Sequence, residues 1–361
     1  MSVPSQPPLC VLSVGRSGSS LATRTLNLLG VHLGADSELL PPSEQNELGF
    51  WEHEEIYRIN EGILEMFGGS WYRAPELPLG WVQDRRLDEL RERATQVCAA
   101  LASSPAARWG FKDPRTVVVL PFWRQLVGRM DYVICVRRPQ AVIRSVENTR
   151  LPGAERRATA KLWLNRNALA LTETVSERRM FIFYEDWFED AHAVVEKLAT
   201  FIVSEGVDDL GAVAGAFRPE LRRADTDERL LPEGEIPELS AMYEQLRLIA
   251  ARDDPAPEVR ARQARVAQVL AQGYGVRETL RKAVLETQEK AAVFRAETES
   301  LREHATALER EQRELRAELS RHQTWLDGIH GSTSWRMTAP LRAAKRRLGP
   351  TPGSRRQRIE H

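Results

Sequence analysis

The chain has 361 residues, of which 42% are hydrophobic and 28% charged, and its formal net charge is zero with a pI near 7.1. This composition predicts a folded protein with a substantial core, and the absence of a basic excess argues against nucleic acid as a partner. No basic leader with a long apolar stretch follows Met1, and no apolar run approaches the roughly 20 residues that cross a bilayer. Cys10, Cys98 and Cys135 have no Cys-x-x-Cys spacing. We therefore expect a cytoplasmic protein with neither a disulfide framework nor a zinc site.

Four short apolar runs predict strands that are buried on both faces of a parallel sheet. They cover residues 9–14, 108–111, 131–136 and 180–184. Amphipathic helices are predicted between them, for example over residues 20–29, 52–67 and 159–175. Strands that alternate with helices predict an α/β fold with a doubly wound parallel sheet, which we assign to residues 1–252.

The composition changes after this domain. Residues 253–257 form a break that contains two prolines, and Arg, Glu and Ala dominate from there to residue 326. A heptad pattern that is mostly apolar predicts a long helix over residues 253–326 that self-associates as a coiled coil. A single solvated helix is the alternative. The main heptad positions are Leu280, Thr287, Phe294, Leu301, Leu308 and Leu315.

The last segment, residues 327–361, is predicted to be a basic tail. Residues 337–348 carry one arginine and lysine cluster and place Leu341, Ala344 and Leu348 on one helical face. Such a helix could contact an anionic membrane surface, and a solvated tail is the other interpretation.

A glycine- and serine-rich loop lies between the first predicted strand and the first predicted helix. The first N–H groups of a helix lack intrahelical partners, and the helix dipole favours an anion there. Glycines allow close approach of the backbone, and Arg16 adds a fork of donors that suits phosphate or sulfate oxygens. The loop therefore predicts an anion-binding site made by Gly15, Arg16, Ser17, Gly18, Ser19 and Ser20.

A second candidate anion contact follows the strand at residues 131–136. Arg137 stands at the strand end, Pro139 suits the first turn of a helix, and Ser145 lies about 9 Å further along that helix. An arginine at the end of a strand and a serine on the next helix can contact one phosphate from two sides. We expect Arg137 and Ser145 to do so.

Together these motifs resemble those of the sulfotransferase superfamily. Residues 15–21 (GRSGSSL) are similar to its 5′-phosphosulfate loop, and Arg137 with Ser145 is similar to its 3′-phosphate pair. Residues 112–115 (KDPR) are similar to the element that carries an active-site lysine, here Lys112. Residues 184–187 (YEDW) are similar to a Tyr-Glu-Asp-Leu element whose tyrosine, here Tyr184, lies near the adenine.

The resemblance implies a parallel-sheet enzyme that transfers a sulfuryl group from 3′-phosphoadenosine 5′-phosphosulfate (PAPS), without a metal, to a hydroxyl or amine. Arg16 and Lys112 would stabilise the sulfuryl oxygens and the leaving phosphate. A general base is expected between residues 47 and 55, where Glu52 and Glu47 are the candidates and His53 is a third. Glu52 could equally favour a helical N-terminal turn. Arg222 and Arg223 are a further candidate contact for the 3′-phosphate.

Two other functions fit parts of the chain. A nucleotide-dependent kinase would need the Gly-x-x-x-x-Gly-Lys-Ser/Thr loop, which residues 15–20 do not match. A non-catalytic scaffold for glycan assembly would depend on the coiled coil alone. The acceptor is expected to be a glycan or a small molecule, because residues 332–342 are similar to endings found on bacterial cell-surface glycosyltransferases. This similarity hints at a cell-surface polysaccharide or glycolipid precursor.

Overall fold

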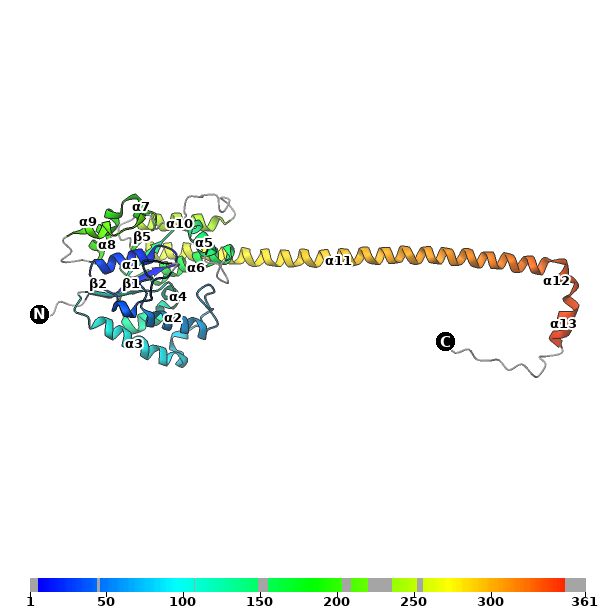
Figure 1. The fold of residues 1–361 in the computed structure, drawn as a ribbon, viewed down its shortest axis with the longest axis horizontal. Coiled ribbons are helices and arrows are strands. Elements are labelled where there is room, and N and C mark those ends of the chain that lie inside the picture. Colours follow the sequence, from blue (N-terminus) through cyan, green and yellow to red (C-terminus); the bar gives the residue numbers. More distant parts are fainter. Residues whose placement is uncertain are drawn as a thin grey trace. The chain divides into compact units, whose positions relative to one another are not determined.

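The computed structural model describes residues 6–43, 46–106, 108–148, 155–202, 209–219, 236–251 and 256–347, with the backbone alone for residues 344–347. The chain divides into two compact units, Met1–Thr279 and Leu280–His361. The first unit contains the sheet and the helices around it (Figure 1).

A five-stranded parallel sheet with the order β2-β3-β1-β4-β5 forms the centre of the first unit. The central strand β1 pairs on both sides, so that Leu9 lies opposite Gly110 of β3 and Asp131 of β4. All four predicted strands are confirmed, with ends that shift by no more than one residue. The short strand β2 was not predicted, because two residues carry no periodicity. The strands are β1 (Leu9–Ser13), β2 (Val31–His32), β3 (Arg108–Lys112), β4 (Asp131–Val136) and β5 (Arg179–Phe183).

The helices α1 to α6 of the first unit lie between successive strands in the chain, and α7 to α10 follow β5. The helix predicted over residues 52–67 begins later than expected, at Glu54, and Glu52 lies outside it. These helices are α1 (Ser19–Leu28), α2 (Glu54–Met66), α3 (Asp88–Ala102), α4 (Thr116–Val127), α5 (Pro139–Glu147), α6 (Arg156–Glu173), α7 (Asp186–Glu189), α8 (Ala191–Ile202), α9 (Leu210–Gly215) and α10 (Pro237–Ala250). Short 3-10 helices cover Asp36–Glu38, Trp81–Gln83 and Arg85–Leu87.

Helices cover both faces of the sheet, which confirms the doubly wound α/β fold (Figure 1). Cys10 and Leu12 of β1 face one core, to which α2, α3, α4, α6 and α10 contribute. Leu9 and Val11 face the other core, formed with α1 and α8. Because both faces are buried, the strands lack the alternation of polar and apolar residues that a half-exposed sheet shows.

The long helix α11 (Pro257–Gly331) belongs to both units. Ala264, Ala267, Ala271 and Tyr274 form a buried stripe at helical spacing, and the Tyr274 hydroxyl donates to the Arg157 carbonyl at 3.1 Å. The first unit therefore extends to Thr279, beyond the boundary predicted at residue 252. Pro257 is the first residue of α11.

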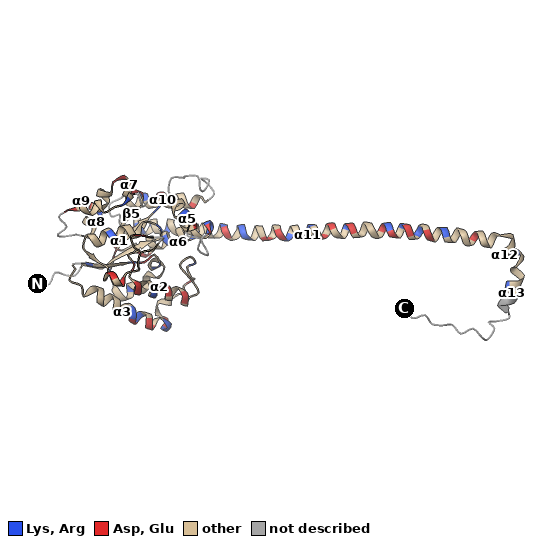
Figure 2. Ribbon diagram, viewed as in Figure 1, with Lys and Arg blue, Asp and Glu red and all other residues tan. Residues whose placement is uncertain are grey.

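In the second unit, α11 continues unbroken from Leu280 to Gly331 and is followed by α12 (Thr333–Met337) and α13 (Ala339–Arg347). The long helix is thus observed, whereas its pairing stays a prediction. Acidic and basic residues are interspersed along it (Figure 2). Part of the basic tail, residues 348–361, lies outside the described residues, so its membrane contact also stays a prediction. None of the helices described is both long and apolar enough to cross a membrane.

Candidate active site

The predicted anion loop connects β1 to α1 and has an unusual backbone. Gly15, Arg16 and Gly18 have φ angles of 86°, 57° and 76°, in the left-handed region that glycine tolerates best. A Cβ at Gly15 would lie 2.6 Å from the Trp71 ring, and one at Gly18 would collide with the Tyr184 ring. The loop is closely covered by aromatic side chains and has no room for larger residues at these positions.

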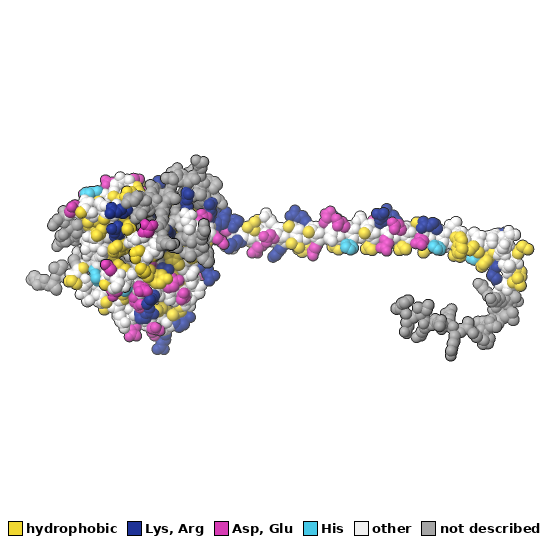
Figure 3. Space-filling model, in the orientation of Figure 1, with side chains coloured by type: hydrophobic (Ala, Val, Ile, Leu, Met, Phe, Trp, Pro, Cys, Tyr) yellow, Lys and Arg dark blue, Asp and Glu magenta, His cyan; other side chains and the backbone are white. Residues whose placement is uncertain are grey.

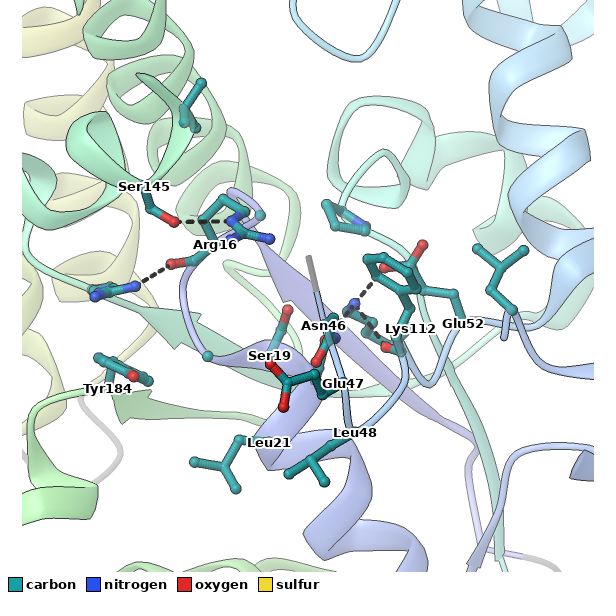
Figure 4. Close-up of a pocket in the computed structure, with 18 of the residues that line it drawn as sticks. Arg16, Ser19, Leu21, Asn46, Glu47, Leu48, Glu52, Lys112, Ser145 and Tyr184 are labelled. Atoms are coloured by element: carbon teal, nitrogen blue, oxygen red, sulfur yellow. Dashed lines mark hydrogen bonds and ion pairs between the residues drawn. The ribbon is translucent and has the colours of Figure 1, made fainter. Parts of the chain in front are cut away.

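The loop and the second predicted anion contact are joined directly. The Arg16 Nε donates to the Ser145 Oγ at 2.9 Å, and an Arg137 guanidinium nitrogen donates to the Arg16 carbonyl at 3.1 Å (Figure 4). Ser145 lies on α5, which begins at Pro139 as predicted. Two motifs that are about 120 residues apart in the chain therefore lie side by side at the carboxyl ends of β1 and β4.

Arg137 is held in place by packing as well as by this bond. Its side chain is buried, and its guanidinium carbon lies 4.1 Å from the centre of the Tyr184 ring. The Trp163 Nε1 donates to the Arg137 carbonyl at 3.1 Å. Such stacking of a guanidinium on an aromatic face fixes the orientation of its donors.

Lys112, at the end of β3, forms a buried ion pair with Glu52. Its Nζ also donates to the Phe50 carbonyl at 3.1 Å and to the Ser20 Oγ at 3.4 Å (Figure 4). Lys112 and Glu52 are only 2% and 6% exposed, and burial raises the pKa of Glu52 above its ordinary value. Glu52 precedes α2 and turns inward to Lys112, so it does not serve as a first-turn acid of that helix.

The other two candidate bases lie in different surroundings. Glu47 is exposed and lines the same cavity (Figure 4). His53 is the N-cap of α2, where its Nδ1 accepts from the Glu55 N–H at 3.3 Å. Burial lowers the pKa of His53, and this residue does not line the cavity.

A cavity of about 590 Å³ collects nearly all the predicted site residues. Besides His53, Ser17 does not line it: Ser17 is buried, and its hydroxyl donates to the Gly15 carbonyl at 3.2 Å. The predicted residues that line the cavity are Gly15, Arg16, Gly18, Ser19, Ser20, Glu47, Glu52, Lys112, Arg137, Ser145 and Tyr184.

Sequence reasoning missed the residues that complete the walls. They are mainly aromatic and apolar side chains from loops, and isolated tryptophans or tyrosines in a sequence do not reveal whether they line a cavity or a core. Among the described residues these are Leu21, Leu40, Asn46, Leu48, Phe50, Tyr57, Tyr72, Pro114, Arg115, Val146, Phe188, Phe217 and Arg218. Arg222 and Arg223, the further candidates for phosphate contact, lie outside the described residues.

The tryptophans divide between the cavity and the core. Trp71 lines the cavity, whereas Trp123 and Trp163 are fully buried in the core. Trp51, whose φ is 59°, donates through Nε1 to the Leu48 carbonyl at 2.8 Å and does not line the cavity. No group of three or more potential metal ligands occurs among the described side chains.

Comparisons with known proteins give matches in structure only. No family model and no curated protein matches the sequence. Sulfotransferase STF9 from Mycobacterium avium matches with 12% identity over 70% of this chain and 78% of its own, at a TM-score of 0.43. The sulfotransferase domain of the Synechococcus PCC 7002 olefin synthase matches with 18% identity over 75% of this chain and 94% of its own, at a TM-score of 0.36. Retinol dehydratase in complex with retinol and PAP matches with 14% identity over 70% of this chain and 84% of its own, at a TM-score of 0.34.

All three matches have TM-scores below 0.5 and identities below 20%, so neither a family nor a function follows from them.

Proposed function

We propose that this protein is a sulfotransferase that moves a sulfuryl group from PAPS to a hydroxyl or amine group. The observation that carries the proposal is that the two segments predicted to bind anions meet at one cavity, through the bonds that Arg16 makes with Ser145 and Arg137 with Arg16. A ligand with phosphates at both its 3′ and 5′ positions suits such a pair of neighbouring sites.

The donor would be held at three places along the cavity. The N-terminus of α1 and the glycines before it suit the 5′-phosphosulfate, since backbone donors and the helix dipole both favour an anion there. Arg137 and Ser145 suit the 3′-phosphate. Tyr184, beside Arg137 and against Gly18, offers a ring near the adenine. These donors fit an anionic nucleotide without help from a metal.

The chemistry needs charge stabilisation and a proton acceptor. The bond from sulfur to the phosphate oxygen breaks, a bond from sulfur to the acceptor oxygen or nitrogen forms, and the acceptor loses its proton. Lys112 and Arg16 are cations at the cavity wall that would stabilise the sulfuryl oxygens and the leaving phosphate.

We propose Glu52 as the general base, with Glu47 as the alternative. A carboxylate whose pKa is raised by burial is a stronger proton acceptor than an exposed one, which favours Glu52. Its ion pair with Lys112 supports a linked role, because a lysine that turns toward the sulfuryl group would release the carboxylate for the acceptor.

The acceptor side of the cavity suits a molecule with flat or apolar faces. Phe50, Tyr57, Trp71 and Tyr72 supply aromatic surface to the cavity that the Glu52–Lys112 pair also lines. Sugars and small hydroxylated molecules both stack on such rings. We propose a glycan, a glycolipid precursor or a small molecule as acceptor, guided also by the tail at residues 332–342.

A binding experiment tests the donor assignment. The thermal stability of the full chain is measured with 3′,5′-ADP and with ATP, each with and without Mg²⁺. We expect 3′,5′-ADP to stabilise the protein by about 2.7 kcal/mol at a hundredfold excess over its Kd, independently of Mg²⁺. Stabilisation only by ATP with Mg²⁺ would favour a kinase instead.

A matched pair of arginine variants sharpens this experiment. Arg137 is buried at the cavity, whereas its neighbour Arg138 is exposed. Arg137→Met should reduce the preference for 3′,5′-ADP over 5′-AMP by at least about tenfold, since a charged hydrogen bond contributes roughly 1.5–3 kcal/mol. Arg138→Met should leave the preference unchanged. Equal effects of the two variants would count against the 3′-phosphate site.

A further inference from the structure

The second unit presents an apolar stripe that runs along α11. Phe294, Leu301 and Leu308 are 69%, 71% and 62% exposed in the single chain, and Leu315 and Leu319 are similarly exposed. Yellow side chains recur along this helix in Figure 3. Large apolar residues that repeat every seven positions are typical of a helix that packs against another helix.

The residues of the stripe define a heptad register. The leucine-rich positions, Leu280 to Leu315, occupy d, and the companion positions occupy a. Leucine at d with β-branched residues at a favours two strands, and Val284 and Thr298 are β-branched. The a positions are Val284, Ala291, Thr298, Ala305, Gln312 and Leu319.

Charges beside the stripe differ between its two flanks. The e flank is mainly basic, with Arg281, Arg295, Arg302 and Arg316 against one acid, Glu309. The g flank is mainly acidic over residues 297–318, with Glu297, Glu311 and Glu318 after Lys290. Charged residues at these flanking positions determine partner choice and orientation.

We propose that α11 pairs with a second copy of this chain as a parallel, in-register, two-stranded coiled coil. In a parallel pair, each g residue faces the e residue five positions later on the other copy. This arrangement is favourable for Glu297 with Arg302 and for Glu311 with Arg316, and unfavourable for Lys290 with Arg295. Each of these pairs occurs twice by symmetry.

The antiparallel arrangement does not suit these charges. It would place e residues opposite e residues and g residues opposite g residues, so that arginines face arginines and glutamates face glutamates. Like charges that face each other are destabilising. The charge pattern therefore favours a second copy of this chain as the partner, with the two helices parallel.

Cysteine cross-linking of the full chain tests the direction and register. Ala291 occupies position a, inside the stripe, and Ala296 occupies position f, on the opposite side of the helix. Under mild oxidation Ala291→Cys should form disulfide-linked dimers, whereas Ala296→Cys should stay at the background of the unmodified chain, which has Cys10, Cys98 and Cys135. If Ala291→Cys has the mass of a dimer in solution but forms no disulfide at position 291, the parallel in-register pairing is overturned.

Charge reversal tests the electrostatic argument, with the dimer dissociation constant measured by analytical ultracentrifugation. Glu297→Arg together with Glu311→Arg should weaken the dimer roughly tenfold or more, because four attractive pairs become repulsive. Adding Arg302→Glu and Arg316→Glu should restore it. Tighter association of the first variant would indicate the antiparallel arrangement, and a chain that is monomeric at about 100 µM would overturn the proposal. Neither result depends on nucleotide binding, so the outcome is independent of the proposed sulfotransferase activity.

Discussion

Glu52 and Lys112 form the chemically most unusual pair of residues in the cavity. Both charged side chains are buried. The Lys112 ammonium donates to the Phe50 carbonyl and the Ser20 hydroxyl in addition to Glu52. Burial penalises an isolated carboxylate, which is why the pKa of Glu52 is raised although a cation lies beside it. A buried pair at the end of a strand, facing a cavity, is typical of a functional position.

Substitution of the two candidate bases distinguishes their roles. Glu52→Gln should reduce kcat by about 10²-fold or more, and Glu47→Gln by less than about tenfold, since general bases contribute roughly 10²–10⁴. The rate of the unmodified enzyme should rise with pH through a midpoint above the ordinary glutamate pKa of 4.5, because only the carboxylate accepts a proton. Measuring 3′,5′-ADP affinity on both variants separates a lost base from a lost fold. A larger loss in Glu47→Gln would transfer the role to Glu47.

At the scale of elements, α6 connects the anion loop to the aromatic wall of the cavity. Arg166, on this helix, donates to the Val14 carbonyl at 2.9 Å and to the Trp71 carbonyl at 2.6 Å. Its guanidinium also lies 5.0 Å from the centre of the Trp71 ring. Burial lowers the pKa of Arg166 to about 9, so it stays charged at neutral pH. One side chain thus holds the end of β1 and the residue that covers Gly15.

Removal of this bridge should loosen the loop. Arg166→Met is expected to lower the free energy of unfolding by about 2 kcal/mol, because two hydrogen bonds from a charged donor are lost while a desolvated charge is removed. The affinity for 3′,5′-ADP should fall as well. Arg166→Lys keeps the charge but cannot donate to two carbonyl groups in the geometry of a guanidinium. It should recover only part of the stability and part of the 3′,5′-ADP affinity. Urea unfolding and nucleotide titration measure them, and an unchanged affinity in Arg166→Met would show that Trp71 does not need this support.

At the scale of the molecule, the chain divides into two compact units, and the residues of α11 belong to both. The part of α11 before Leu280 contributes Ala264, Ala267, Ala271 and Tyr274 to the core of the first unit. Arg260 donates to the Glu177 carbonyl at 2.7 Å in the same region. All the described residues that line the cavity precede Thr279 as well. The first unit therefore contains its own core and its own site.

Two truncations test this division. A chain that ends at Thr279 should bind 3′,5′-ADP with unchanged affinity and be monomeric, because the leucine-rich stripe is absent. A chain that ends at residue 252 should be less stable by about 4 kcal/mol, since one tyrosine and three alanines are no longer buried. Thermal unfolding measures the stability of the two truncated chains, and light scattering measures their oligomeric state. Equal stability of the two truncated chains would place the boundary back at residue 252.

The sequence by itself determined the parallel sheet, the anion loop and the leucine-rich helix. These features depend on local patterns: buried strands without alternation, glycines before a helix, and leucines at seven-residue spacing. The loop with Arg16 and the later pair Arg137 and Ser145 were identifiable for the same reason, because each motif is contained in a few consecutive residues.

Only the tertiary structure decided which of these segments meet. Strand order places β3 and β4 on either side of β1, and it brings Lys112 to Glu52, which is 60 residues away, and Arg137 to Arg16. Tertiary packing also brings Trp71 to the cavity and Arg166 to the Trp71 carbonyl. Local periodicity does not encode strand order or the path of a loop, because both depend on which apolar faces pack together once the chain is compact.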